Sequence, residues 1–109
     1  MADNFEPHGQ AAPAADVATD LLTVAAVTNY VISGLFVCAY TAAADDFSVS
    51  VAYLGAAEVA KQWLYRHAPI PGGETLVVVA GLTLKPTDIL RVECGLGTVS
   101  FNLFGDRIA

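Results

Sequence analysis

Short runs of alternating apolar and polar residues, separated by turn residues, are the dominant pattern in the chain. In residues 47–53, Phe, Val, Val and Tyr alternate with Ser, Ser and Ala, and the same period of two recurs at 89–94 and 99–103. This period is typical of β-strands, because successive side chains of a strand point to opposite faces of the sheet. Turn sequences such as Pro-Ile-Pro-Gly-Gly at 69–73 fall between the runs.

These runs predict about seven or eight antiparallel strands, with turns every 8–12 residues or so. The long apolar run at 29–40 predicts a strand covered on both faces, and Gly34 in its middle predicts a bulge or bend. Residues 55–61 predict a loop or one helical turn, because this alanine-rich run is too short to form a stable helix alone. We therefore expect an all-β fold, a single jelly-roll-like β-sandwich. The expected strands cover residues 21–24, 29–40, 47–53, 62–67, 74–79, 82–84, 89–94 and 99–103.

The first 16 residues have a different composition from the rest of the chain. They contain two prolines, one glycine and five alanines, and Phe5 is their one aromatic residue. Such a segment has little apolar surface to bury, so we expect a flexible N-terminal arm at 1–16 followed by the sandwich domain at 17–109. The arm is either a frayed terminus or a segment that orders on a neighbouring subunit with Phe5 as its anchor, and the sequence leaves both open.

The composition indicates one folded domain with apolar surface to spare. Hydrophobic residues make up 55 % of the 109 residues and charged residues only 15 %. Few charges on a small domain favour contacts with partner subunits. The net charge is −6, and the five basic residues are scattered along the chain. Since phosphate backbones require a basic patch, we expect no nucleic-acid partner.

One stretch, residues 21–44, carries no charge and is long enough to cross a bilayer, which takes about 20 apolar residues. Its flanks are acidic, at Asp20 and at Asp45, whereas membrane-spanning helices are oriented by flanking Lys and Arg. Its β-branched and aromatic residues favour strands. We therefore expect strands here and no membrane partner. The first 20 residues hold four acids and no Lys or Arg, so we expect no secretory signal either.

Candidate catalytic groups are few. His8 falls in the expected arm, and His67 lies between a strand and a proline turn, where an exposed loop residue is expected. Cys94 could pair with His67 as nucleophile and base only if the fold brought them together, and no local motif supports this pairing. Asp45 and Asp46, next to three alanines, predict a solvated turn rather than a calcium site. We expect a chain that is not an enzyme and holds no cofactor or metal.

The two cysteines, Cys38 and Cys94, both lie in apolar strand-like runs. We expect two buried, reduced thiols that behave as small hydrophobic residues. The alternative is a disulfide that joins two strands, which would imply an oxidising compartment.

Trp63 and Tyr65 are the residues most suited to binding a partner. Their spacing in a strand places them on one face, with Leu64 and Arg66 on the other. Large aromatic side chains either fill a core, anchor a protein interface or stack on a sugar ring. We take Trp63, Tyr65 and Phe5 as the candidate partner-binding residues.

The C-terminal part of the chain reads, from Ala68, APIPGGETLVVVAGLTLKPTDILRVEC, followed by GLGTVSFNLFGDRI. A proline–glycine turn leads to a strand, which is followed by a leucine, two turn residues, an aspartate, an apolar residue and Arg-Val. A glycine turn and a last strand come next. This order of strands and turns resembles a motif common in small virion proteins of tailed bacteriophages. The earlier SVSVAY, from Ser48, fits the alternating middle strand of these proteins. The resemblance covers residues 21–109 and departs at Thr87, where glycine is expected.

This resemblance implies a β-sandwich on a phage particle. The protein would be a capsid decoration (cement) protein that stabilises the head by bridging major capsid protein subunits, or an accessory of the neck or tail. Such proteins act through contacts with virion proteins rather than through chemistry, and they are commonly homo-oligomers, of which a trimer is favoured here. The implied location is the virion, after assembly in the cytoplasm of the bacterial host.

Two other functions remain open at the level of sequence, because β-sandwiches serve many purposes. A carbohydrate-binding sandwich for host-surface recognition requires an exposed aromatic platform at Trp63 or Tyr65. A small enzyme requires His67 to lie close to Cys94 or to an acid within a pocket.

Overall fold

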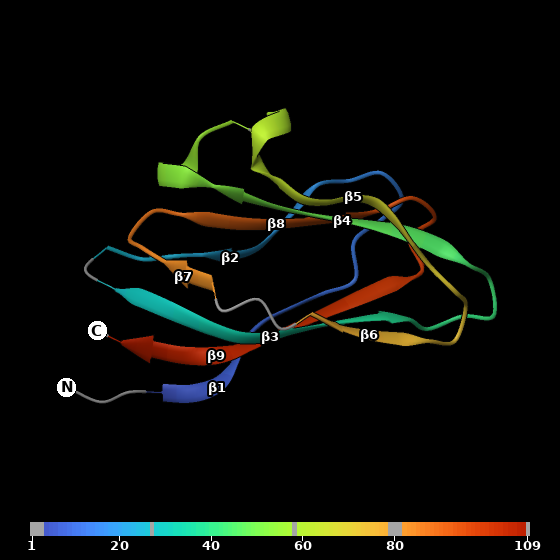
Figure 1. The fold of residues 1–109 in the computed structure, drawn as a ribbon, viewed down its shortest axis with the longest axis horizontal. Helices are drawn as coiled ribbons and strands as arrows, with labels where there is room; N and C mark the ends of the chain where they lie inside the picture. The colour runs from blue at the N-terminus through green and yellow to red at the C-terminus, as the bar shows by residue number, and fades with distance from the viewer. Residues whose placement is uncertain (1–3, 27, 58, 79–81, 109) are drawn as a thin grey trace.

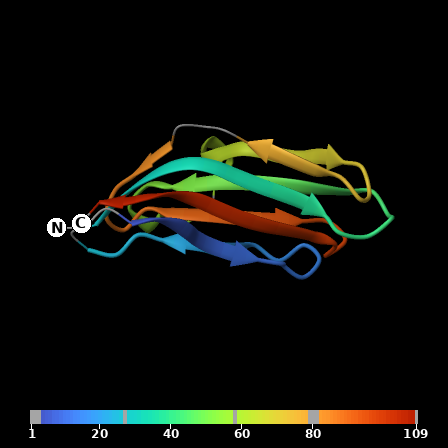
Figure 2. The ribbon, with the colours of Figure 1, turned by 90° about the horizontal axis from the view of Figure 1, so that it is seen from below.

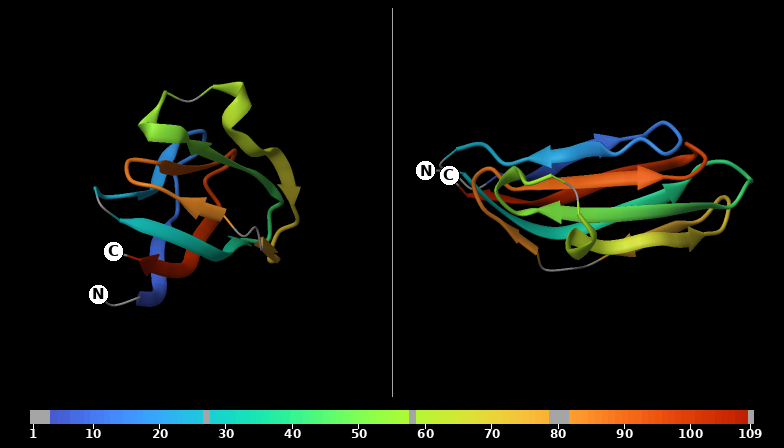
Figure 3. Two further views of the ribbon diagram at one scale, coloured as in Figure 1. Left: turned by 60° about the vertical axis from the view of Figure 1, so that its left-hand side comes forward. Right: turned by 90° about the horizontal axis from the view of Figure 1, so that it is seen from above.

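The computed structural model describes residues 4–26, 28–57, 59–78 and 82–108, with the backbone alone for residues 4–8 and 108. Nine strands and two short 3₁₀ turns make up the described fold (Figure 1). The strands are β1 (Asn4–Ala11), β2 (Thr19–Thr23), β3 (Asn29–Ala39), β4 (Asp45–Ala52), β5 (Trp63–Ile70), β6 (Thr75–Val78), β7 (Leu82–Leu84), β8 (Ile89–Cys94) and β9 (Val99–Ile108). The 3₁₀ turns, Tyr53–Gly55 and Ala60–Gln62, project beyond β4 and β5 (Figure 3).

The strands form two antiparallel sheets that pack face to face (Figures 1 and 2). One sheet has the order β1-β9-β3-β6, with β7 also paired to β3, and the other has the order β2-β8-β4-β5. From the ends of the chain toward its middle, β1 thus pairs with β9, β2 with β8, β3 with β6 and β7, and β4 with β5. This nested pairing is the jelly-roll arrangement. Because β6 and β7 lie one after the other along β3, they act as one interrupted strand. The expected all-β, jelly-roll-like sandwich is confirmed.

The core lies between the two sheets. It is formed by every second residue of each strand, the one whose side chain faces inward. Phe47 of β4 and Phe101 of β9 meet across the layers with their ring centroids 6.4 Å apart, and both are fully buried. Inward alternation is regular on β8, where Leu90, Val92 and Cys94 are buried. This is the period of two that the sequence shows at 89–94.

The outer face of β4 is more deeply buried than the alternating pattern predicts. Ser48 and Ser50 are both buried, although their positions predicted the exposed side of a half-buried strand. The Ser48 hydroxyl oxygen accepts a hydrogen bond of 3.0 Å from the backbone N–H of His67 on β5. A small hydroxyl side chain therefore allows the neighbouring strand to come close over this face while it satisfies a backbone donor.

The N-terminal segment is part of the sandwich from Asn4 onward, so the expectation of a flexible arm at 1–16 is wrong for β1. β1 pairs antiparallel with β9, and its register runs from Asn4 opposite Arg107 to Ala11 opposite Phe101. The pairing uses backbone groups, which every residue type carries, so it does not require large side chains. Pro7 is tolerated because β1 is an edge strand, and the register shifts between Pro7 and Gly9.

The uncharged stretch at 21–44 enters both sheets, as β2 and β3. The bulge expected near Gly34 is confirmed, because the register between β3 and β9 shifts between Ile32 and Gly34. Gly105 of β9 lies so close to the Val31 carbonyl oxygen that a Cβ atom there would clash with it. Within the described residues, no helix has the length and hydrophobicity that a membrane crossing needs.

Thr87, in the turn between β7 and β8, has a φ of 70°. This left-handed conformation costs a β-branched residue about 1–2 kcal/mol, whereas glycine adopts it freely. We therefore expect Thr87→Gly to raise the free energy of unfolding by about 1 kcal/mol in a urea titration. The control is Thr83→Gly in strand β7, which should lower the free energy of unfolding. A Thr87→Gly variant less stable than the native chain would contradict a strained backbone at Thr87.

Candidate functional site

The candidate nucleophile Cys94 and the candidate base His67 lie on opposite faces of their sheet, and the side chain of His8 lies outside what the structure describes. Cys94 is buried in the core, where burial raises the pKa of its thiol, and its Sγ lies 3.6 Å from the Pro13 carbonyl oxygen. A buried thiol with a raised pKa is a poor nucleophile. His67 faces outward on β5, with Nδ1 3.6 Å from Asp46 Oδ1. Among the described side chains, no group of three or more His, Cys, Asp or Glu residues is placed to hold a metal ion.

The two cysteines lie in different sheets. Cys94 is buried on the inner face of β8, whereas Cys38 is half-buried on β3 opposite Ser100. Both thiols are free. Cys38 is thus more accessible than the expected buried thiol.

Asp45 is a buried hydrogen-bond acceptor, and the expectation of a solvated turn at this residue is wrong. Its Oδ1 accepts from the backbone N–H groups of Asp46 (2.7 Å) and Leu96 (2.9 Å). Its Oδ2 accepts from the N–H (3.2 Å) and hydroxyl (2.8 Å) of Thr98. Burial alone would raise the pKa of Asp45, but the hydrogen bonds from Asp46, Thr98 and Leu96 outweigh it and hold the pKa below 3.8. Asp45 therefore fixes the β8–β9 turn.

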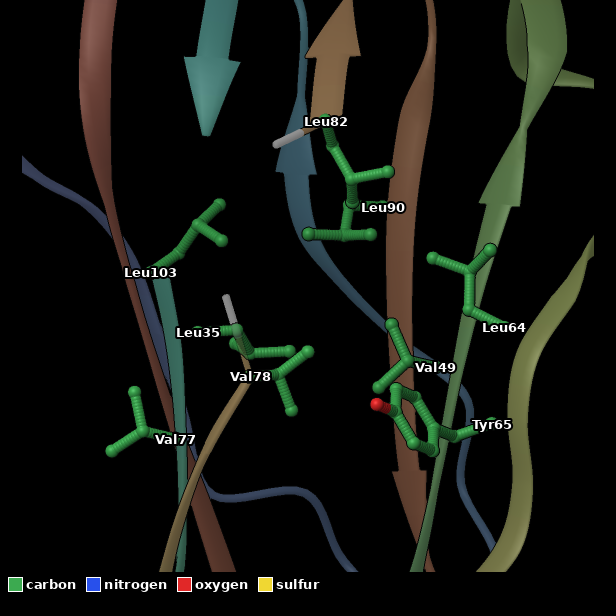
Figure 4. A pocket seen from close by; sticks show the side chains of 9 residues that line it. All are labelled: Leu35, Val49, Leu64, Tyr65, Val77, Val78, Leu82, Leu90 and Leu103. Atoms are coloured by element: carbon green, nitrogen blue, oxygen red, sulfur yellow. The ribbon is translucent and has the colours of Figure 1, made fainter. Parts of the chain in front are cut away.

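Trp63 and Tyr65 lie on opposite faces of their sheet, which corrects the expectation that they share one. Trp63 pairs with Ser50, which faces outward, whereas Tyr65 pairs with Val49, which faces the core. The register shifts between these two pairs, and one extra residue at a bulge reverses the alternation. As a result, Leu64 and Tyr65 both face inward (Figure 4).

Trp63 is half-buried and covered by Arg66. The Arg66 guanidinium carbon lies 4.2 Å from the centroid of the Trp63 ring, which is a cation–π contact. Arg66 also bonds Glu93 Oε1 at 3.3 Å. One face of the indole is thus occupied, which leaves less of it free to stack on a sugar.

Because Trp63 is the only tryptophan, its fluorescence reports on this contact. Arg66→Ala is expected to increase quenching of Trp63 emission by the neutral quencher acrylamide, since removing the guanidinium uncovers one face of the ring. The unfolding free energy should fall by no more than about 1 kcal/mol, as is usual for exposed charged contacts. Lys61→Ala, which removes an exposed cation from the neighbouring 3₁₀ turn, is the control and should leave acrylamide quenching unchanged. Equal acrylamide quenching in both variants would contradict the stacking.

An apolar cleft opens between the sheets along the edge where β5 faces β6 and β7 (Figure 4). Its volume is about 620 Å³. Tyr65 supplies the polar group of its lining, a hydroxyl that points into the cleft (Figure 4). The cleft can therefore accept apolar groups, and the residues described in its lining carry no charged side chain. The lining residues are Leu35, Val49, Leu64, Tyr65, Val77, Val78, Leu82, Leu90 and Leu103.

The rim of this cleft is exposed to solvent. Leu76 and Val77 of β6 are 42 % and 48 % exposed, and Leu64 of β5 is 46 % exposed. The opposite edge of the sandwich is closed, because β1 and β2 approach so closely that a Cβ on Gly9 would clash with the Leu21 carbonyl oxygen. The open edge is thus the surface most suited to an apolar partner.

The three candidate partner-binding residues are separated by the fold. Tyr65 lines the cleft, Trp63 lies on the outer face, and Phe5 belongs to β1 at the far edge, its side chain outside what the structure describes. The cleft itself was missed, since Leu64, Val77 and Leu82 look like ordinary strand residues in the sequence. Comparisons of the chain with models of known protein families, with curated proteins and with solved structures yield no match.

Proposed function

We propose that the chain is a non-enzymatic structural protein of a tailed-bacteriophage particle, where it decorates the head and bridges major capsid protein subunits. The observation that carries this proposal is the apolar open edge: the cleft together with the exposed Leu64, Leu76 and Val77. Burying such a surface contributes roughly 25 cal/mol per Å² of apolar area, and many copies on one particle would add these contributions.

Two further points support the proposal. The jelly-roll is an architecture of viral capsid domains, although it also serves lectins and does not assign a function alone. The resemblance of residues 21–109 to small virion proteins supplies the specific expectation. The protein would assemble as a homo-oligomer in the bacterial cytoplasm and reside in the virion.

The same surface would serve an accessory protein of the neck or tail. That role differs only in which virion protein covers the open edge. A carbohydrate-binding role has less support, because Arg66 covers one face of Trp63 and Tyr65 points into the cleft.

The test is co-sedimentation of the purified chain with expanded, chain-free heads of the phage that encodes it. Saturable binding, with many copies per head, is expected. The double variant Leu64→Ser/Val77→Ser should bind at least tenfold more weakly, because it removes apolar rim area at two sites. The control Val31→Ser changes an exposed residue away from the cleft and should bind as the native chain does. Absence of saturable binding to heads, with binding to tails or necks instead, would select the accessory role.

A further inference from the structure

Strand β6 lacks the charges, prolines and register shifts that most edge strands of this sandwich carry. Edge strands are normally protected by charges, prolines or bulges, which stop them from adding to a foreign sheet. β6 reads Thr-Leu-Val-Val, carries no charge or proline, and pairs with β3 in regular register from Cys38–Thr75 to Leu35–Val78. Its other side faces no strand among the described residues.

Three of the other edge strands, β1, β2 and β5, carry such protection themselves. β1 contains Pro7 and a register shift, and β2 contains Asp20 and a register shift. β5 contains Arg66, Pro69 and two register shifts. β7 continues the β6 edge along β3; it contains no charge or proline either, but it has only three residues and is followed directly by Lys85 and Pro86.

We propose that β6 is a self-association edge, on which β6 of a second copy pairs antiparallel about a two-fold axis. This inference goes beyond the proposed function, in that it names the contact through which free copies of the chain associate; head binding through the same open edge would compete with this contact. A two-fold axis normal to the sheet keeps the inner face of both copies on the same side. In an antiparallel pair, residues directly opposite each other have their side chains on the same face of the sheet. A central residue of β6 must therefore lie opposite the same residue of the second copy, so the axis passes between the two Leu76 residues or between the two Val77 residues.

The charges of the molecule favour this arrangement. A chain with a net charge of −6 repels its own copies, so the contact must lie where charge is absent. Glu74 is the acid nearest to β6, one residue before it. In both antiparallel registers the two Glu74 residues lie at opposite ends of the pair, at least about 14 Å apart along the strand, which exceeds the screening length of roughly 8 Å at physiological salt. A parallel pair would set them side by side.

The pairing would also cover the apolar cleft. Leu76 shares a face with the buried Val37 and therefore faces inward, yet it is 42 % exposed. Pairing brings the cleft mouths of the two copies together, so that Leu76 and the inward-facing Leu64 and Tyr65 are removed from water. Four-residue strands give a smaller interface than the standard of roughly 800 Å² per partner, so the dimer should be weak, with a Kd in the micromolar range or above.

Sedimentation velocity of the full chain over concentrations from about 1 μM to about 500 μM tests the pairing across this affinity range. A concentration-dependent monomer–dimer equilibrium is expected. Val77→Lys should weaken it at least tenfold, because a lysine on the edge opposes strand addition. The matched control is Val31→Lys, which places the same charge on an exposed position of the same sheet, away from β6, and should leave the dimer unchanged.

Disulfide trapping identifies the register. Either Leu76→Cys or Val77→Cys should form a cross-linked dimer under mild oxidation, whereas Val31→Cys and the native chain with its own two thiols should not. A monomer at every concentration would overturn the proposal, as would a trimer or larger ring insensitive to Val77→Lys. Such a ring would leave the head-decoration role standing, whereas a β6-dependent dimer that fails to bind heads would contradict that role alone.

Discussion

Replacing Asp45 by alanine is expected to lower the free energy of unfolding by about 3 kcal/mol. The carboxylate is 8 % exposed and accepts four hydrogen bonds, three from backbone N–H groups and one from the Thr98 hydroxyl. Hydrogen bonds to a charged group contribute about 1.5–3 kcal/mol, and alanine would leave buried donors without an acceptor. A urea titration followed by circular dichroism measures the change.

Asp45 also gives stability a defined dependence on pH. Since its pKa is lower in the folded state than the usual 3.8, its contribution is complete above that value and is lost as the pH falls through the folded pKa. The melting temperature of the native chain should therefore fall in acid more steeply than that of Asp45→Asn, which has no carboxylate to protonate at this position. Parallel acid profiles for the two proteins would contradict the depressed pKa.

The control for the Asp45 variants is Asp20→Ala. Asp20 is half-exposed and pairs with Arg91 at 3.1 Å. Exposed ion pairs contribute at most about 1 kcal/mol, so this variant should remain close to the native stability. If Asp20→Ala lowered the free energy of unfolding as much as Asp45→Ala, the effect would come from removing any acidic residue and not from the buried hydrogen bonds of the Asp45 carboxylate.

Phe47→Ala is expected to destabilise the fold by about 3–5 kcal/mol, as truncation of a fully buried aromatic side chain usually does. Phe47 is fully buried and contacts rings from two sides, with centroids 5.4 Å from Tyr65 and 6.4 Å from Phe101. Truncation removes the transfer free energy of the ring and leaves a cavity between the sheets. Native domains are stable by only about 5–15 kcal/mol, so much of that margin would be lost.

The matched control is Phe36→Ala on the outer face of β3. Phe36 is 39 % exposed and makes one edge-on ring contact, with Phe104 at 5.4 Å. Its truncation should cost about 1–2 kcal/mol in the same urea titration, because less area is returned to water and no enclosed cavity forms. Equal losses at Phe36 and Phe47 would contradict the placement of the core between the two sheets.

The sequence predicts most of the fold because the strands alternate and the turns carry glycine and proline. The alternation at 89–94 and 99–103 is the inward–outward pattern of β8 and β9, and Gly34 lies at a register shift. These features are local, so they can be seen along the chain. The jelly-roll pairing follows from them only in part, since order in a sheet depends on contacts between distant segments.

The errors have a common physical origin, which is that the decisive partner lies far away in sequence. β1 is held by the backbone edge of β9, so its own composition does not reveal it. Asp45 is buried because the turn at Leu96 and Thr98 closes over it. The cleft exists because a bulge turns Leu64 and Tyr65 to the same side, and a bulge is decided by pairing with β4 rather than by residue type.

The most direct test of the proposed role is quantitative mass spectrometry of phage particles purified from the bacterial strain that carries the gene. The measured quantity is the ratio of this chain to the major capsid protein, before and after a high-salt wash. A head-decoration protein held by apolar contacts should be present at a fixed, high ratio that the wash leaves unchanged. Particles that are complete and infectious but contain none of the chain would contradict a structural role in the virion.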